Sequence, residues 1–134
     1  MKFMKNALVA AAFATAALSA SAQEQFFPAL SYRVGPYAAG GTGFFGGVID
    51  YLSLLNAQGG INGVKMTWEE CETEYNATRG VECYERLKKS RGGATMVEPL
   101  STGIAYGLLD RVAQDKIPMT TLGYGRSDAA DGRV

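Results

Sequence analysis

The side chains that could do chemistry in this sequence are few, and they favour binding over catalysis. The 134 residues contain no histidine and only two cysteines. Without histidine there is no Ser-His-Asp or Cys-His nucleophile, and the commonest ligand of transition metals is missing. Two cysteines cannot build a four-cysteine zinc site. We therefore predict a protein that is not an enzyme, with no catalytic residue, no metal site and no cofactor.

The strongest candidate for a ligand contact is the segment before the last predicted helix. Ser101, Thr102 and Gly103 stand where that helix is predicted to begin. Four N–H groups lack partners at a helix N-terminus and the helix dipole favours an anion there, so a carboxylate could bind. The alternative is that Ser101 only caps its own helix, and the two roles are compatible.

Aromatic residues in two other loops are further candidates for the same site. Tyr37 follows the first predicted strand, and Gly123 and Tyr124 follow the last one. Either tyrosine could stack on a small ligand or line an apolar pocket. Packing as a lid without touching a ligand is the alternative for each tyrosine.

The glycine-rich stretch 35–47 contains the pattern G-x-G-x-x-G at positions 41–46. With Glu69 or Glu70, at the end of the next predicted strand, binding a ribose, this pattern would suit a dinucleotide-dependent oxidoreductase. However, the pattern begins six residues after Gly35, whereas a pyrophosphate-binding turn follows its strand almost directly. We favour a flexible loop whose glycines let the backbone approach a ligand or another lobe.

The two cysteines are placed to form a disulfide. Cys71 ends a predicted strand, and Cys83 lies on the next helix, which returns over the sheet. In an oxidising compartment a disulfide is the favoured interpretation, and two buried thiols are the alternative. Redox catalysis is not expected, because there is no C-x-x-C motif.

A scaffold of alternating strands and helices must position these candidates. Apolar and alternating patterns predict four strands, over 31–35, 64–71, 94–97 and 117–122. Each crossover must return the chain to the same edge, so the strands pair in parallel. We predict an α/β fold with an open, mostly parallel sheet and helices on both faces. Ligands of such sheets bind beyond the carboxyl ends of the strands, where the candidate loops lie.

The helices between these strands are predicted from apolar periodicity and capping residues. Asn76 and Ser101 are suitable N-caps for the second and third helices, and a glycine-rich turn at 59–63 ends the first. The apolar face of each helix should point inward. The inward residues are expected to be Phe45, Val48, Leu52 and Leu55 in the first helix, Val81, Tyr84, Leu87 and Lys88 in the second, and Ala105, Leu108, Leu109 and Val112 in the third.

The N-terminus indicates an exported protein. Residues 1–22 have the features of a secretory signal peptide, with a basic start, an apolar run over 7–18, and cleavage between Ala22 and Gln23. The alternative is a membrane anchor, but the run is shorter than the roughly 20 residues that a bilayer requires. We expect a periplasmic protein in which residues 23–134 form the ligand-binding part.

The overall charge argues against one class of partner. Thirteen basic residues balance thirteen acidic ones, whereas a general nucleic-acid binder needs a basic excess to release counterions. We therefore expect no nucleic-acid partner.

One segment resembles a known family. The run 56–65, which contains Gly59, Gly60 and Ile61, resembles the end of the first helix in the branched-chain amino-acid binding proteins of ABC transporters, which have the type I periplasmic binding fold. The segment from Glu70 to Arg79 is similar to that family's entry to the second helix. The resemblance covers about residues 31–128, and we expect residues 23–134 to be an incomplete first lobe.

The resemblance implies a monomeric, two-lobed receptor that closes on a small ligand and delivers it to an ABC permease in the inner membrane. It implies that Ser101 and Thr102, with Gly123 and Tyr124, hold the α-carboxylate and α-amine of an amino acid; amides or urea are related ligands. At Gly40 the sequence departs from relatives that often place an aromatic residue there, which changes the pocket. A ligand-sensing ectodomain of the same fold is the alternative function.

Overall fold

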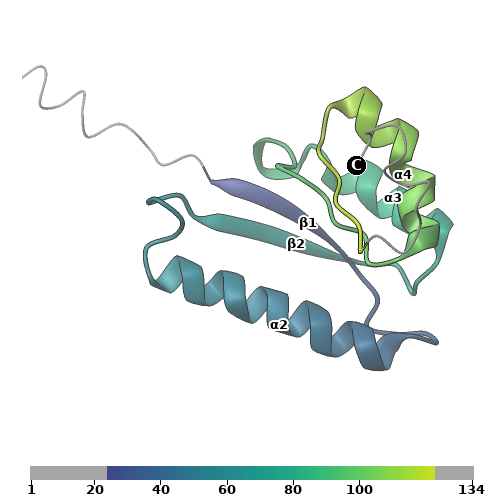
Figure 1. The fold of residues 1–134 in the computed structure, drawn as a ribbon, viewed down its shortest axis with the longest axis horizontal. Helices are drawn as coiled ribbons and strands as arrows, with labels where there is room; N and C mark the ends of the chain where they lie inside the picture. The colour runs from purple at the N-terminus through teal and green to yellow at the C-terminus, as the bar shows by residue number, and fades with distance from the viewer. Residues whose placement is uncertain (1–23, 123–134) are drawn as a thin grey trace, which may run out of the picture.

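A pair of parallel strands forms the regular part of the sheet (Figure 1). The computed structural model describes residues 24–122. Strand β1 (Gln25–Ser31) pairs with β2 (Met66–Glu72) in a parallel register that matches Gln25 with Met66 and Ser31 with Glu72. The first strand predicted from the sequence, over 31–35, is therefore placed wrongly, because β1 ends at Ser31.

Two further segments extend the sheet on the other side of β1. Phe26 forms a parallel bridge with Ala94, and Val97 forms one with Met119. The order is thus β2, β1, the segment around Ala94–Val97, and the segment around Met119, all parallel. The predicted open parallel sheet is confirmed, although the strands expected over 94–97 and 117–122 are reduced to single bridges.

Pro28 explains why the third segment pairs so briefly. The N–H of Gln25 donates to Lys65 beside β2, whereas the carbonyl of Phe26 accepts from the N–H of Thr95 on the other side. Alternate residues of a strand face the same neighbour, so Pro28 occupies the position from which the next N–H would reach this third segment. Proline has no N–H, and the ladder stops there.

Helices cover both faces of the sheet, as predicted (Figure 1). Helix α2 (Ala38–Ala57) connects β1 to β2 on one face. Helices α3 (Ala77–Leu87) and α4 (Thr102–Asp115) lie side by side on the other face, and a short 3₁₀ turn, η1 (Ser90–Gly92), follows α3. No helix in the described part of the chain is both long and apolar enough to cross a membrane.

The predicted caps and turn are confirmed. The Asn76 side chain accepts a hydrogen bond from the N–H of Arg79, and the Ser101 hydroxyl accepts one from the N–H of Ile104. After α2, the turn at 59–63 uses positive φ angles, and at Gly60 a β-carbon would lie 2.1 Å from the carbonyl oxygen of Val64. Only glycine fits that position.

The core lies between the sheet and the α3–α4 pair. Its buried side chains include Phe26, Leu30, Tyr84, Leu87, Ile104, Leu108 and Val112. The buried Tyr84 donates its hydroxyl hydrogen to Asp115, which also accepts from Lys88 at 2.7 Å, so the C-terminal ends of α3 and α4 are joined by polar contacts. Burial, with the Asp115 hydrogen bond, raises the pKa of Tyr84 far above its ordinary value. The hydrogen bond from Lys88, and then that from Tyr84, lowers the pKa of Asp115.

Helix α2 differs most from the sequence-based expectation. The stretch 35–47 is not the expected flexible loop, because α2 begins at Ala38 and includes most of its glycines. Of the four side chains expected to point inward, Phe45 is buried and Val48 is exposed. Gly41 explains the tight packing at the start of α2, since a β-carbon there would lie 2.0 Å from the carbonyl oxygen of Tyr32.

Contact between α3 and α4 depends on Gly80, and this can be tested. A β-carbon on Gly80 would lie 2.6 Å from the Ile104 side chain, so Gly80→Ala should lower the free energy of unfolding by about 2 kcal/mol through overpacking. In the matched control Gly46→Ala, the nearest atom is on Arg33 at 4.0 Å, and alanine should stabilise α2 by about 0.5–1 kcal/mol. Urea unfolding followed by circular dichroism measures both; equal effects would contradict this packing.

Candidate functional site

The loops that follow the strands meet at one edge of the sheet (Figure 1). Helix α2 begins shortly after β1 ends, α3 begins after β2, and α4 begins after the segment around Val97. Because the strands are parallel, all three helices have their N-termini at the carboxyl edge. Partial positive charge from these N-termini therefore gathers where α/β sheets bind ligands.

The N-terminus of α4 offers backbone donors without intrahelical partners at this edge. Ser101 is buried, and its hydroxyl and carbonyl oxygens accept from the N–H groups of Ile104 and Ala105. The capping role of Ser101 is thereby confirmed. The N–H groups of Thr102 and Gly103 lie in the first turn of α4, where backbone N–H groups have no carbonyl partner within the helix. Ala77, the first residue of α3, would lie 3.9 Å from a β-carbon on Gly103, so two helix N-termini adjoin here.

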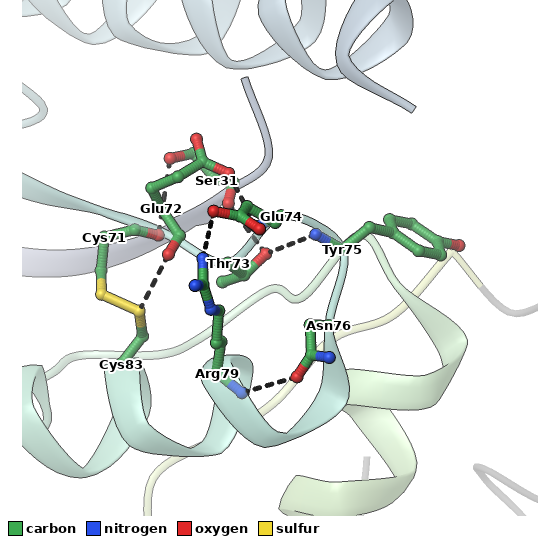
Figure 2. The surroundings of a disulfide bond; sticks show 9 residues. All are labelled: Ser31, Cys71, Glu72, Thr73, Glu74, Tyr75, Asn76, Arg79 and Cys83. Atoms are coloured by element: carbon green, nitrogen blue, oxygen red, sulfur yellow. Dashed lines mark hydrogen bonds and ion pairs between the residues drawn. A yellow bond between two sulfur atoms is a disulfide. The ribbon is translucent and has the colours of Figure 1, made fainter. Parts of the chain in front are cut away.

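A buried threonine fixes the loop after β2 (Figure 2). Both the N–H and the hydroxyl of Thr73 donate to the carbonyl of Ser31, at 2.7 and 2.9 Å, which ties this loop to the end of β1. The Thr73 hydroxyl also accepts from the N–H of Tyr75. Glu74 and Tyr75 both adopt positive φ angles. In Figure 2 the Tyr75 ring points away from this polar cluster.

The predicted disulfide is present. Cys71 near the end of β2 is bonded to Cys83 on α3, with the Cα atoms 5.7 Å apart. Figure 2 shows the bond beside the same loop, with the N-cap Asn76 on the far side of Arg79. The disulfide therefore anchors α3 to the strand end from which the Thr73 loop departs.

Arg33 links the loop after β1 to β2. Its guanidinium donates to both carboxylate oxygens of Glu70, at 2.6 and 2.9 Å, and to the carbonyl of Thr42 in α2. The backbone N–H of Arg33 donates to Glu72 at 2.7 Å. The Arg33 hydrogen bond holds the pKa of Glu70 below its ordinary value, and the same bond raises the pKa of Arg33. The first turns of α2 are thus held against the sheet edge.

An aromatic stack lies along the edge. The Tyr37 ring packs on Tyr75 with 4.2 Å between centroids, and Tyr75 meets Tyr32 edge-on at 5.0 Å. Tyr32 in turn meets the buried Phe45 edge-on at 5.3 Å. The stack joins the loops after β1 and β2 and leaves Tyr37 as its exposed end.

The face of the sheet under α2 contains an apolar pocket of about 210 Å³. It lies between α2 and residues of β1, β2 and the third segment. Its lining includes Phe27, Trp68, Met96, Phe44 and Leu52, and one carboxylate, Glu98. This face is less completely filled than the face under α3 and α4.

The candidates from the sequence divide into three groups. Ser101, Thr102, Gly103 and Tyr37 lie in the loops and first turns at the carboxyl edge. Gly123 and Tyr124, like the cleavage residues Ala22 and Gln23, lie outside the described residues. The G-x-G-x-x-G pattern lies inside α2, where its N–H groups serve the helix, so neither a dinucleotide-binding loop nor a flexible loop is present there.

Three residues at the edge were not found by sequence reasoning. Arg33, Thr73 and Tyr75 act through contacts with residues about 40 positions away or with neighbours across the edge, which no local pattern reveals. The positions directly after strand ends were the available signal, but misplacing β1 hid the role of Arg33.

Comparison with known proteins assigns the chain to a family. The family model described as "periplasmic binding protein" matches residues 24–133. The chain belongs to this family. A comparison with curated proteins finds no match.

Solved structures of other periplasmic binding proteins and transporter components share this fold. A crystal structure described as an ABC transporter permease from the Pseudomonas fluorescens group is 48% identical over 80% of this chain and 26% of that one, with a TM-score of 0.74. A fatty acid ABC transporter substrate-binding protein from Thermomonospora curvata is 17% identical over 75% of this chain and 25% of that one, with a TM-score of 0.67.

A third similar structure is the branched-chain amino acid transporter substrate-binding protein of Streptococcus pneumoniae in complex with isoleucine. It is 17% identical over 73% of this chain and 28% of that one, with a TM-score of 0.65. At 17% identity, this structure and the Thermomonospora structure show the fold alone. The chain spans about a quarter of the length of these three proteins.

The disulfide should contribute measurably to stability. Replacing Cys71 and Cys83 together by alanine should lower the free energy of unfolding by about 3 kcal/mol, because the bond closes a short loop in the unfolded chain. Urea unfolding with and without dithiothreitol measures the loss. The reductant should destabilise the native protein and leave the double variant unchanged; a native protein indifferent to reduction would contradict the expectation.

The Arg33–Glu70 pair should give a pH-dependent contribution. Since the pKa of Glu70 is lowered in the folded state, the pair stabilises above the ordinary glutamate pKa of 4.5 and loses this as the pH falls through the folded value. Both side chains are about one-third exposed, so Glu70→Gln should cost about 1 kcal/mol or less at pH 7.

Chemical unfolding at pH 7 and at about pH 3 tests this contribution, because protonation of Glu70 progressively removes it as the pH falls. The difference between the native protein and Glu70→Gln should therefore be smaller at the lower pH. Glu69→Gln, at the neighbouring carboxylate, is the control and should change little at either pH. A Glu70→Gln difference that is as large at about pH 3 as at pH 7 would contradict the assignment.

Proposed function

We propose that this chain is part of the first lobe of a solute-binding protein that serves an ABC importer in the periplasm. Family membership supports the binding role over an enzymatic one. The observation that carries the proposal is the N-terminus of α4 at the carboxyl edge of the sheet, where Thr102 and Gly103 have N–H groups without intrahelical partners. Here the lobe binds its ligand and performs no chemistry on it.

The ligand group that suits this helix N-terminus is a carboxylate. Two adjacent N–H donors and the dipole of α4 stabilise a negative charge, and the Thr102 hydroxyl adds a third donor. Ser101 keeps the first turn in place, because its buried oxygens are already occupied by Ile104 and Ala105. Ser101 is therefore a positioning residue, and the direct contacts come from Thr102 and Gly103.

The exposed end of the aromatic stack provides an apolar wall at the same edge. Tyr37 presents its ring there and is supported from behind by Tyr75. A small amino acid with an apolar side chain combines the two features, carboxylate at α4 and apolar body beside Tyr37. Gly123 and Tyr124 complete the site in this proposal by holding the α-amine. Amides and urea are the other small polar ligands that such a site could hold.

The partners and location follow from the same proposal. Residues 1–22 direct export and are removed after Ala22, and the ligand-loaded protein docks on an ABC permease at the inner membrane. Each chain holds its own ligand without a residue from another copy.

A substitution at Thr102 tests the carboxylate site. Proline is favoured at the first helical position, and Ser101 already has the extended angles (φ −129°, ψ 119°) that a residue before proline prefers. Thr102→Pro should therefore keep α4 and remove one N–H and the hydroxyl. Thr102→Ala keeps the N–H and is the matched control.

Isothermal titration calorimetry with isoleucine, valine, octanoate, acetamide and urea provides the readout. Binding of a carboxylate ligand should weaken at least tenfold in Thr102→Pro, which corresponds to about 1.4 kcal/mol, and much less in Thr102→Ala. Binding of acetamide or urea that Thr102→Pro leaves intact would refute the carboxylate site while keeping the binding role. Absence of heat with all five compounds would count against the choice of ligand class.

A further inference from the structure

The turn that follows β2 has a strained backbone. Glu74 and Tyr75 have φ angles of 52° and 61°, so two consecutive residues adopt the left-handed conformation that favours glycine. A bulky residue such as tyrosine rarely adopts it, and strain of this kind persists only where the surrounding contacts enforce it. Strained residues cluster at ligand-binding sites. This turn lies at the carboxyl edge of the sheet, because it follows β2 directly.

Contacts on both sides enforce the strained turn. The Glu72 carboxylate accepts a hydrogen bond from the N–H of Glu74 at 2.7 Å. The Thr73 hydroxyl, which is tied to the end of β1, accepts one from the N–H of Tyr75 at 3.2 Å. From the loop after β1, a β-carbon on Gly35 would lie 3.2 Å from the carbonyl oxygen of Glu74, so this loop packs closely on the turn.

The enforced backbone sets the position of the Tyr75 ring. Figure 2 shows the ring pointing away from the polar cluster around Thr73. The half-buried ring contacts two rings of the loop after β1, with centroids 4.2 Å from Tyr37 and 5.0 Å from Tyr32. Among residues 24–122 the Tyr75 hydroxyl has no hydrogen-bond partner. The ring, and not the hydroxyl, therefore makes the side-chain contacts of Tyr75.

Tyr37 is the ring of this stack that a ligand can reach. It is 56% exposed, and its plane is tilted by 37° from that of Tyr75, so Tyr75 covers one face of the ring. The stack also lies near the N-terminus of α4. Ala77 adjoins Gly103 there, and Tyr75 is only two residues before Ala77, which is a span of about 8 Å or less.

We propose that Tyr75 is a positioning residue that determines ligand specificity: by holding the Tyr37 ring, it favours a ligand with an aromatic ring over an aliphatic ligand of the same size. This inference rests on the proposed function, which binds the carboxylate of the ligand at α4. The ring of the ligand extends the stack on the open side of Tyr37. Because Tyr37 is already held, little conformational entropy is lost on binding.

The preference follows from the geometry of aromatic contacts. Aromatic rings in offset-stacked or edge-to-face contact gain roughly twofold to tenfold in affinity beyond the effect of the area that they bury. A saturated ring of similar size buries a similar area on Tyr37 but lacks this additional gain. The position of Tyr37 therefore discriminates between two ligands that differ only in the aromaticity of the ring.

Phenylalanine and cyclohexylalanine test this inference, because they share the α-carboxylate and α-amine and have six-membered rings of similar size. Isothermal titration calorimetry on the exported protein should give a dissociation constant for phenylalanine about threefold or more below that for cyclohexylalanine. Equal constants, or tighter binding of cyclohexylalanine, would overturn the inference.

Substitutions at Tyr75 test whether the preference depends on its ring. Tyr75→Phe keeps the ring and should keep the preference, whereas Tyr75→Leu should abolish it by releasing Tyr37. The matched control is Tyr51→Leu, because Tyr51 is a 61% exposed tyrosine in the C-terminal half of α2, outside the stack. A preference that survives in Tyr75→Leu, or is lost in Tyr75→Phe or in the control, would overturn the inference.

A substitution at Tyr37 provides the test if Tyr75→Leu does not fold, which urea unfolding followed by circular dichroism reports. Tyr37 is the exposed end of the stack, so Tyr37→Leu leaves the contact between Tyr75 and Tyr32 in place. Tyr37→Leu should abolish the preference for phenylalanine. Survival of the preference in this variant would also overturn the inference.

Isoleucine and octanoate separate this inference from the proposed function. Heat with either compound and none with phenylalanine would overturn the aromatic preference and leave the carboxylate site in place. Absence of heat with all four carboxylates would refute this inference together with the proposed class of ligand.

Discussion

Parallel pairing of β1 with β2 is the constraint on which the rest of the structure depends. A parallel pair needs a crossover, and α2 supplies it on one face of the sheet. The chain then passes back across β1 to the segment around Ala94, which places α3 on the opposite face, and continues in that direction, which places α4 beside it. Every helix that follows a strand therefore starts at the same edge of the sheet. The position of the candidate site is set by strand direction, and the side chains of the loops then set its chemistry.

The edge is held in place by contacts that do not require a ligand. Thr73 ties the loop after β2 to the end of β1, and Arg33 ties the loop after β1 to Glu70. At the opposite edge, Asn56 near the end of α2 bonds both backbone groups of Met66. Each contact satisfies a backbone group or charge that would otherwise be costly to bury. A site held in this way loses little conformational entropy when a ligand arrives, and this favours affinity.

The parts of the fold that local patterns determine could be predicted from the sequence. Asn76 and Ser101 are correct as caps because capping is a contact across three residues. The turn at 59–63 is correct because positive φ angles favour glycine. The disulfide prediction is correct because Cys71 and Cys83 lie on a strand and on the helix that follows it, so one local connection places both residues.

The errors arose where distant contacts override local preference. Strand β1 was missed because apolar residues lie on both of its faces and Pro28 interrupts it, so no alternation marks it. The third and fourth strands were predicted too long. For the third strand the reason is that no local pattern shows that Pro28 of β1 faces it. In the candidate site, Arg33, Thr73 and Tyr75 could not be ranked, since their partners lie in other loops.

Packing within the described residues explains only some of the glycines of α2. Five glycines within the first half of the helix cost about 3–5 kcal/mol relative to alanine, which is a large fraction of the stability of a small domain. Gly41 is required by the approach of Tyr32, but Gly40, Gly43 and Gly47 have open space on the outward side. Packing within residues 24–122 therefore requires one of the five glycines, Gly41, and leaves the other four without a close contact there. These glycines suggested a loop because low helix propensity is a local signal, whereas the parallel crossover from β1 to β2 favours a helix in this stretch.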